Sequence, residues 1–211
     1  MARTAVLAGA TGLVGRFLLR RLAIAPEYDR VYALARHEPE YEPRVQWLRT
    51  DFANLDAVCA PLAPDDVYCC LGTTAAKAGP AGLEDVDYRM VVDLAKATRA
   101  AGAKQFIVVS ALGASSLSPA HYSRVKARME SAVSRLGFEA VHIFRPSLLI
   151  GPRTEERFWE DLFEKSIMPV VTPLLIGPLK SLRPVAGDTV AAAMVAAALK
   201  PAKGRKIHHL P

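Results

Sequence analysis

The chain has 211 residues, of which 51% are hydrophobic and 23% are charged, and its formal net charge is +6. This length and composition suit one globular domain with a full core, and they exclude a disordered chain. The basic side chains are scattered without a run of five, which argues against a nucleic-acid-binding surface. Their excess charge suits a site for a polyanionic cofactor instead.

The cysteines and the first residues bear on the compartment. Cys59, Cys69 and Cys70 are too few and too clustered for a disulfide framework. The opening segment MARTAVLAGATG runs straight into a structural motif rather than a secretory signal. No stretch of 18 apolar residues is free of charge, so we expect no membrane span. These features predict a cytoplasmic protein.

Short apolar strands alternate with amphipathic helices along the chain. The strands are predicted at 4–8, 30–35, 45–50, 66–71, 105–110, 140–144 and 206–210, and the helices at 13–25, 83–101, 119–136, 154–165 and 188–199. Continuously apolar strands rich in Val, Ile and Leu are typical of a parallel sheet buried on both faces. The alternation therefore predicts an α/β fold, a Rossmann-type doubly wound parallel sheet. Residues 1–211 are expected to form one domain, with the proline-rich segment 147–187 as a small loop-rich cap on the substrate side.

The first strand-to-helix turn carries the motif GATGLVG at residues 9–15. A tight turn needs a residue that tolerates positive φ, and a pyrophosphate can approach the backbone only where no side chain blocks it. A third glycine lets the helix pack close to the sheet, and the first amides of the helix point at the phosphates. We therefore expect dinucleotide binding by Gly9, Thr11, Gly12, Leu13, Val14 and Gly15.

The residue after the second predicted strand bears on the choice of cofactor. NAD(H) is usually held there by an acidic residue that binds the ribose 2′-hydroxyl. This chain has Arg36 at that point, and Arg16 directly follows the third glycine. Guanidinium groups pair well with phosphate, so the sequence favours NADP(H), whose ribose carries a 2′-phosphate. Glu38 lies close enough to keep NAD(H) as the alternative.

Tyr122 and Lys126 are the candidate catalytic pair. Their four-residue spacing places both side chains on one face of a helix. A neighbouring ammonium group stabilises a phenolate, which lets a tyrosine act as a general acid or base near neutral pH. Ser110 ends the fifth predicted strand, at the edge where open α/β sheets bind ligands, and is the candidate hydroxyl that orients the reacting oxygen. The alternative is that Tyr122 is an ordinary half-buried aromatic residue and Lys126 is solvated surface.

Five segments occur in a fixed order: GATGLVG, CCLGTTAAKAG, VVSALGA, YSRVK and FRPSLLIGPR. This set resembles the extended and atypical short-chain dehydrogenase/reductases, among them the HIV Tat-interacting oxidoreductase-like family and its small bacterial epimerase/dehydratase-like relatives. The resemblance covers nearly the whole chain and implies a Rossmann fold that binds NAD(P).

The resemblance also implies roles for individual residues. It places Asp51 at the adenine amine and Phe52 beside the adenine ring, and it makes Lys126 a ligand of the nicotinamide ribose. Further cofactor contacts are implied for Leu71, Gly72 and Thr73 along the ribose and phosphates, and for Pro146 and Leu148 at the nicotinamide end. The chain departs from longer relatives in having Ser110-Ala111 where they carry paired small or hydroxyl residues. Ser115 and Ser116 therefore remain alternatives to Ser110 as the hydroxyl donor.

We accordingly expect an NADP(H)-dependent oxidoreductase of the short-chain dehydrogenase/reductase type. Little of the chain follows Pro146, so a small carbonyl or alcohol substrate fits better than a nucleotide-sugar. Two alternatives stay open: an NADPH-binding regulatory or sensor protein with little turnover, and a small-substrate epimerase or dehydratase. No metal, nucleic acid or membrane partner is expected, and a pair of long helices could form a homodimer.

Overall fold

A computed structural model describes residues 3–38, 42–73, 75–150 and 183–210. The helix predicted at 154–165 and most of the cap predicted at 147–187 lie outside the described residues. Within the described part the fold is a seven-stranded sheet of order β3-β2-β1-β4-β5-β6-β9. Its strands are β1 (Arg3–Ala8), β2 (Tyr28–Ala35), β3 (Val45–Arg49), β4 (Asp66–Cys69), β5 (Gln105–Val109), β6 (Ala140–Pro146) and β9 (Gly204–Leu210). All neighbouring strands are parallel, which confirms the predicted Rossmann-type sheet.

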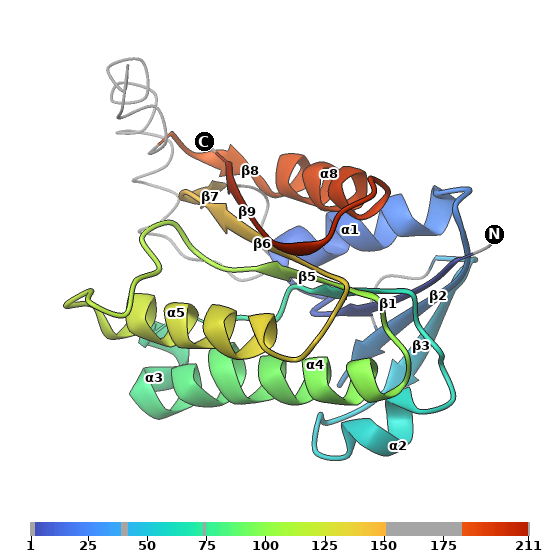
Figure 1. The fold of residues 1–211 in the computed structure, drawn as a ribbon, viewed down its shortest axis with the longest axis horizontal. Helices are drawn as coiled ribbons and strands as arrows, with labels where there is room; N and C mark the ends of the chain where they lie inside the picture. The colour runs from blue at the N-terminus through green and yellow to red at the C-terminus, as the bar shows by residue number, and fades with distance from the viewer. Residues whose placement is uncertain (1–2, 39–41, 74, 151–182, 211) are drawn as a thin grey trace.

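Helices cover both faces of this sheet (Figure 1). On one face lie α1 (Leu13–Ile24) and α8 (Gly187–Ala198), which pack against each other. On the other lie α2 (Leu55–Cys59), α3 (Ala75–Glu84), the π-helix η1 (Asp85–Arg89), α4 (Met90–Ala100) and α5 (His121–Ser134). The short strands β7 (Leu149–Ile150) and β8 (Val185–Ala186) form a separate two-stranded ladder.

The central strand β1 explains why the core has two halves. Successive side chains of a strand point to opposite faces of the sheet. Val6 and Ala8 accordingly pack with the residues of α4 and α5, whereas Ala5 and Leu7 pack with those of α1 and α8. All four are fully buried. Because the strands are parallel, their carboxyl ends share one edge of the sheet, and α1 and α5 both begin at that edge.

A buried polar network lies at the opposite end of the strands, where they begin (the amino edge of the sheet). The Asp66 carboxylate accepts a hydrogen bond from the Tyr28 hydroxyl at 2.7 Å and pairs with the Arg3 guanidinium at 2.5 Å. The hydroxyls of Tyr28 and Tyr68 lie 2.7 Å apart. Burial holds the pKa of Asp66 above its usual value despite these partners. The network joins the first residues of β1, β2 and β4, so it contributes to the fold and lies away from the carboxyl edge.

One predicted helix differs from the structure. The apolar spacing at 83–101 predicts a single helix, but the chain there forms the end of α3, the π-helix η1 and then α4. Leu83, Met90, Val91 and Leu94 keep a helical spacing and are all buried, so the pattern conceals the break. The π-helix adds residues to one turn without changing which side the flanking helices bury.

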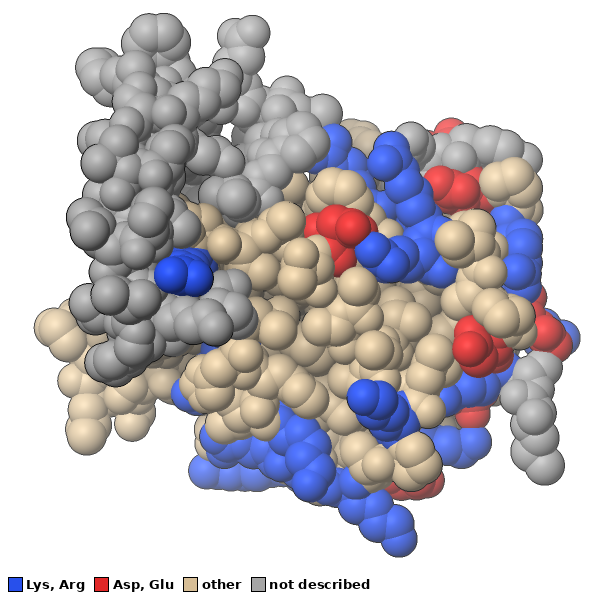
Figure 2. Space-filling model, turned by 90° about the horizontal axis from the view of Figure 1, so that it is seen from above, with Lys and Arg blue, Asp and Glu red and all other residues tan. Residues whose placement is uncertain are grey.

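On the face that includes α8 and α1, uncharged residues make up much of the surface, an acidic group lies beside a basic one near the middle, and further charged side chains of both signs lie toward the borders (Figure 2). No helix in the described part of the chain is long and apolar enough to cross a membrane. Among the same residues, no cluster of three His, Cys, Asp or Glu side chains could hold a metal ion.

Candidate cofactor and active site

The glycine turn between β1 and α1 has no room for side chains. Gly9 has φ of +85°, and a Cβ there would lie 2.5 Å from the carbonyl carbon and oxygen of Cys70, which directly follows β4. A Cβ at Gly15 would lie 1.9 Å from the Gly9 carbonyl oxygen. The first glycine is thus required by the backbone conformation and by contact with β4, and the third by the close approach of α1 to the turn.

The amino end of α1 suits an anion. Gly12 occupies the N-cap, and no side chain of the described residues caps the helix there. The first turn also contains no acidic residue. The first amides of the helix are therefore left for an external acceptor, and the positive end of the helix dipole favours a negative one. A pyrophosphate fits this turn, because its oxygens need backbone donors and close access to the chain.

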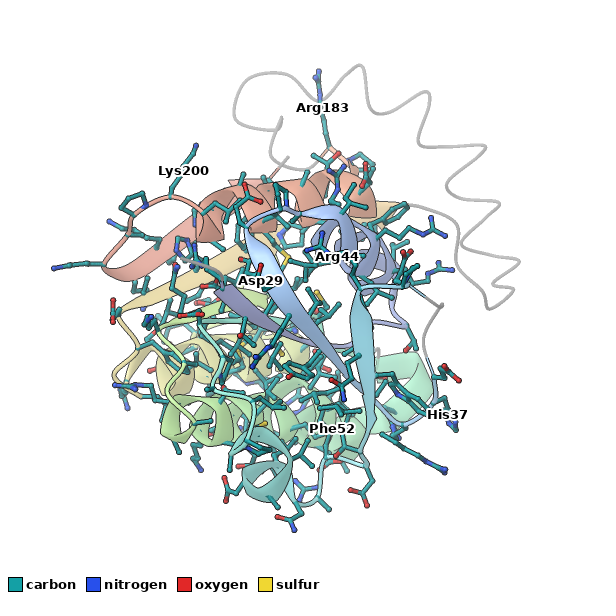
Figure 3. The ribbon with its side chains drawn as sticks, turned by 90° about the vertical axis from the view of Figure 1, so that its right-hand side faces the viewer. Asp29, His37, Arg44, Phe52, Arg183 and Lys200 are labelled. Carbon is teal, nitrogen blue, oxygen red and sulfur yellow. The ribbon has the colours of Figure 1, made fainter. Side chains whose placement is uncertain are left out.

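The residues predicted to hold the adenosine half lie past β2 and β3, beside the glycine turn. Arg36 and Asp51 are exposed at the carboxyl ends of these neighbouring strands. Phe52 has a positive φ of 68°, which is costly for a bulky residue and concentrates at functional sites. Its backbone N–H donates to the Thr50 hydroxyl at 3.0 Å, which fixes this turn. Phe52 lies against the body of the molecule, whereas His37 extends outward (Figure 3).

The segment Leu71–Thr73 follows β4 and leads toward the candidate catalytic helix. The backbone N–H of Thr73 donates to Asp87 Oδ2 at 2.9 Å. A Cβ on Gly72 would lie 3.3 Å from Asp87 Oδ1 and 3.9 Å from Lys126 Nζ. Gly72 and Thr73, two of the three residues that the resemblance places along the cofactor, therefore lie against Asp87 and Lys126.

Tyr122 and Lys126 lie together at the start of α5, as their spacing predicts. Lys126 Nζ is 5.8 Å from the centre of the Tyr122 ring. Tyr122 is 36% exposed and Lys126 only 2% exposed, so the tyrosine is accessible to solvent whereas the lysine is buried. This corrects the alternative in which Lys126 is solvated surface.

The buried ammonium has an anionic partner that lies far from it in the sequence. Lys126 Nζ lies 2.8 Å from Asp87 Oδ1 and donates to the Val109 carbonyl at 3.3 Å. Burial alone would lower the pKa of Lys126, but Tyr122 and Asp87 together raise it above the ordinary lysine value. Lys126 is therefore held as a cation.

Ser110 directly follows β5 and is bound to a second buried carboxylate. Its hydroxyl donates to Glu130 Oε1 at 2.6 Å, and Arg145 clamps the same carboxylate with bonds of 2.9 and 2.6 Å. Ser110 and Glu130 are 3% and 2% exposed. The hydroxyl can donate to a substrate oxygen only by leaving Glu130. Ser115 and Ser116, the alternative donors, are exposed in the loop before α5.

The residues predicted for the nicotinamide end differ in exposure. Pro146 ends β6 and is buried, and its carbonyl accepts the Leu112 N–H at 2.9 Å. Leu148 is 49% exposed. Pro146 thereby holds the loop after β5, which carries the serines, against the end of β6. Leu148 presents apolar surface at the same edge of the sheet.

Two residues of this site are absent from the sequence prediction. Glu130 stands four residues after Lys126, so the same helical spacing that links Tyr122 to Lys126 could have indicated it. Asp87 lies in the charged segment EDVDYR, which reads as an exposed helix face. A local pattern gives little sign that the central acid of this segment is fully buried.

Comparison with known proteins identifies the family. Residues 9–162 match the model of a family described as NAD(P)H-binding. The chain belongs to this NAD(P)H-binding family. The matched range includes the glycine turn, Ser110, Tyr122 and Lys126. A nicotinamide dinucleotide is thus the cofactor class that the uncapped helix and the glycine turn accommodate.

Curated relatives support the same assignment. The mitochondrial protein FMP52 of Eremothecium gossypii is 33% identical over 208 residues, which cover 95% of this chain and 91% of the relative. Protein HTATIP2 of Rattus norvegicus is 33% identical over 168 residues, which cover 77% of this chain and 69% of the relative. The resemblance to the HIV Tat-interacting oxidoreductase-like family is therefore confirmed.

Solved structures share the fold. The Bordetella bronchiseptica enzyme WbmH, solved with NAD+, superposes with a TM-score of 0.73 at 14% identity and covers 99% of this chain and 76% of its own. The PhqB reductase domain of Penicillium fellutanum gives a TM-score of 0.71 at 20% identity, covering 97% of this chain and 66% of its own. These likenesses confirm the Rossmann-type architecture.

The relatives overturn the predicted compartment. FMP52 proteins from several fungi, among them Eremothecium gossypii and Lodderomyces elongisporus, are named as mitochondrial. The cytoplasmic prediction is therefore wrong. It rested on the lack of a secretory pattern and on too few cysteines for disulfides, and neither feature distinguishes the cytoplasm from a mitochondrion.

Proposed function

We propose that this NAD(P)H-binding protein is an NADP(H)-dependent oxidoreductase that acts on a small carbonyl or alcohol. The observation that carries the proposal is the partly exposed ring of Tyr122 beside the buried ammonium of Lys126, next to the segment that follows β4. A phenol in this setting is accessible to a substrate and lies beside a fixed positive charge, as a proton donor to a carbonyl requires.

The proposed chemistry is a proton transfer matched to a hydride transfer. When bound, the cofactor supplies or accepts the hydride at the substrate carbon. During reduction, Tyr122 donates its hydroxyl proton to the carbonyl oxygen, and during oxidation it takes the proton back from the alcohol. Lys126 stabilises the phenolate. Ser110 orients the reacting oxygen once its hydroxyl turns from Glu130.

The preference for NADP(H) rests on two guanidinium groups near the adenosine end. Arg36 follows β2, and Arg16 is in the first turn of α1. Either suits a 2′-phosphate, and no acidic residue stands directly after β2. Calorimetric titration with NADPH and NADH tests this choice. We expect much tighter binding of NADPH, and we expect Arg36→Ala to weaken NADPH binding while NADH binding stays the same.

The catalytic assignment is tested by Tyr122→Phe in a screen of small aldehydes and ketones. Removing the hydroxyl should abolish NADPH consumption and leave the dissociation constant of NADPH within about twofold, because the hydroxyl acts on the substrate. Tyr88→Phe is the matched control, since Tyr88 packs against Arg128 and lies outside the proposed chemistry. Full turnover by Tyr122→Phe would contradict the assignment.

A second candidate is an NADPH-binding regulatory protein with little turnover. It is favoured by the Ser110 hydroxyl, whose proton is directed at Glu130 rather than toward a substrate. Tight, saturable binding of NADPH without consumption of any carbonyl in the screen would favour this candidate over the oxidoreductase.

A further inference from the structure

The ion pair between Lys126 and Asp87 is buried and joins separate elements. Side-chain exposure is 3% for Lys126 and 0% for Asp87, with 2.8 Å between Nζ and Oδ1. Lys126 comes from α5 and Asp87 from the π-helix η1. A single-turn π-helix is uncommon and frequently occurs at functional sites. Here the π-helix carries the carboxylate that meets the ammonium.

The same carboxylate also holds the segment after β4. Its Oδ2 accepts the Thr73 N–H at 2.9 Å, while its Oδ1 faces Lys126. Gly72 lies directly over the pair, since a Cβ there would be 3.3 Å from Oδ1 and 3.9 Å from Nζ. Asp87 therefore links the segment assigned to the cofactor with the cation assigned to proton transfer.

The surroundings of Lys126 contain few other charges that could keep it ionised. Asp87 faces it from η1, Tyr122 from its own helix, Cys69 from β4, and the Val109 carbonyl from β5. Burial raises the pKa of Cys69 to about 12, so that thiol stays neutral near physiological pH. A buried ammonium without a counter-charge loses its proton readily, and documented cases titrate several units below ordinary lysine.

We propose that Asp87 is a positioning residue that keeps Lys126 positively charged and fixed under the Leu71–Thr73 segment, independently of the cofactor. The charge and position of Lys126 do not depend on the proposed function. Only the consequence for proton transfer by Tyr122 rests on it. A neutral Lys126 would withdraw the charge that stabilises the phenolate, so Asp87 supports the proton transfer without touching the substrate.

The test is a pH titration of Lys126 by nuclear magnetic resonance in the cofactor-free protein. Lysine labelled with 13C at Cε reports the protonation of Nζ, and Lys126→Arg identifies the resonance among the nine lysines. In the wild type, Lys126 should titrate at or above the ordinary lysine value of about 10.4. In Asp87→Asn, which keeps the shape and the acceptor for Thr73, its proton affinity should fall about tenfold or more.

Asp93→Asn is the matched control. It removes the carboxylate 3.6 Å from Lys96 on α4, where both side chains are about half exposed. It should leave the titration of Lys126 unchanged. A purely structural role for Asp87 would lower stability without moving the Lys126 midpoint, so an unchanged midpoint in Asp87→Asn overturns the proposal.

If Asp87→Asn does not fold, the titration is repeated in Tyr122→Phe, which removes the other group that favours the charged form of Lys126. A buried ammonium that is not sustained by Asp87 would titrate well below ordinary lysine, and that result would also overturn the proposal. Because no cofactor is present, the outcome is independent of nicotinamide binding. Failure to bind NADPH or NADH, with the expected Lys126 titration, would remove the proposed function and leave the role of Asp87 in place.

Discussion

Tyr122, Lys126 and Glu130 stand four residues apart on one face of α5, and their environments differ. Tyr122 is 36% exposed, whereas Lys126 and Glu130 are each 2% exposed. Lys126 is paired with Asp87, and Glu130 with Arg145 and Ser110. The two inner residues are committed to partners within the protein. The outer residue has the access that proton exchange with a substrate requires.

Glu130 should be important for stability as well as for the site. Glu130→Gln leaves Arg145 without its anionic partner in a largely buried position, and we expect a loss of about 3 kcal/mol in the free energy of unfolding. Urea denaturation measures it. The control is Glu84→Gln, whose partner Arg128 is 52% exposed, with an expected loss below about 1 kcal/mol. Equal losses of unfolding free energy in the two variants would contradict the argument that burial makes the Glu130–Arg145 pair more important for stability than the exposed Glu84–Arg128 pair.

The third glycine of the turn gives a prediction for both stability and binding. In Gly15→Ala the added Cβ would lie 1.9 Å from the Gly9 carbonyl oxygen, so α1 must move away from the turn. We expect a loss of about 3 kcal/mol or more in unfolding free energy, together with greatly weakened NADPH binding by calorimetry. Gly113→Ala is the control. It has φ of +77° but no neighbour within 4 Å, so it should cost only about 1 kcal/mol.

At the scale of elements, the outermost strand β9 and its neighbour β6 carry a pair of stacked imidazole rings. His142 on β6 and His208 on β9 have ring centres 5.2 Å apart, and their facing nitrogens are 3.0 Å apart. Burial lowers the pKa of His142 from 6.5 to about 4, and it also lowers the pKa of His208. Both rings therefore stay neutral in the folded protein where an unfolded chain would already bind protons.

This pair predicts a pH dependence of stability. The depressed pKa of His142 means that the unfolded state takes up protons first, so stability falls as the pH decreases from about 6.5 to about 4. Near pH 5 the loss from His142 is about 2 kcal/mol. Urea midpoints measured between pH 7 and pH 5 should fall in the wild type and fall less in His142→Phe. His37→Gln, at an exposed position, should keep the full pH dependence.

The elements themselves were largely predictable, and the exceptions have physical causes. Strands such as β1 and β5 are recognisable because both of their faces are buried, which requires an unbroken apolar run. The π-helix η1 escaped prediction because Leu83 and Met90 maintain a helical apolar spacing across it. The proximity of Tyr122 and Lys126 was predictable because a spacing of four residues on one helix fixes their relation. Asp87 was missed because its contact with Lys126 depends on how η1 packs against α5.

At the scale of the whole molecule, the amino ends of the strands (the amino edge) and their carboxyl ends (the carboxyl edge) carry different groups of residues. The amino edge holds the network of Asp66, Arg3 and Tyr28, and the carboxyl edge holds the glycine turn and the start of α5. At a strand rise of about 3.3 Å per residue, Asp66 is roughly 13 Å from Cys70 at the carboxyl edge. Changes at one edge should therefore have little effect on the other.

Asp66→Asn tests this separation. The Arg3 guanidinium loses its buried counter-charge, and we expect the free energy of unfolding to fall by about 2 kcal/mol or more. The dissociation constant of NADPH, measured by calorimetry at a temperature where the variant is folded, should stay within about twofold of the wild type. A large change in affinity would show that the two edges are coupled.

The position of β9 has a consequence for the order in which the chain can assemble. Ala140 of β6 pairs with Gly204 of β9, although 64 residues separate them in the sequence. During synthesis, β6 can dock on β5 long before its outer neighbour has been translated. Until then, β6 presents an open sheet edge that includes Ile143 and Phe144, and such edges invite pairing with other chains. Pairing with β9 thus covers this edge of β6 and should reduce aggregation of the nascent protein.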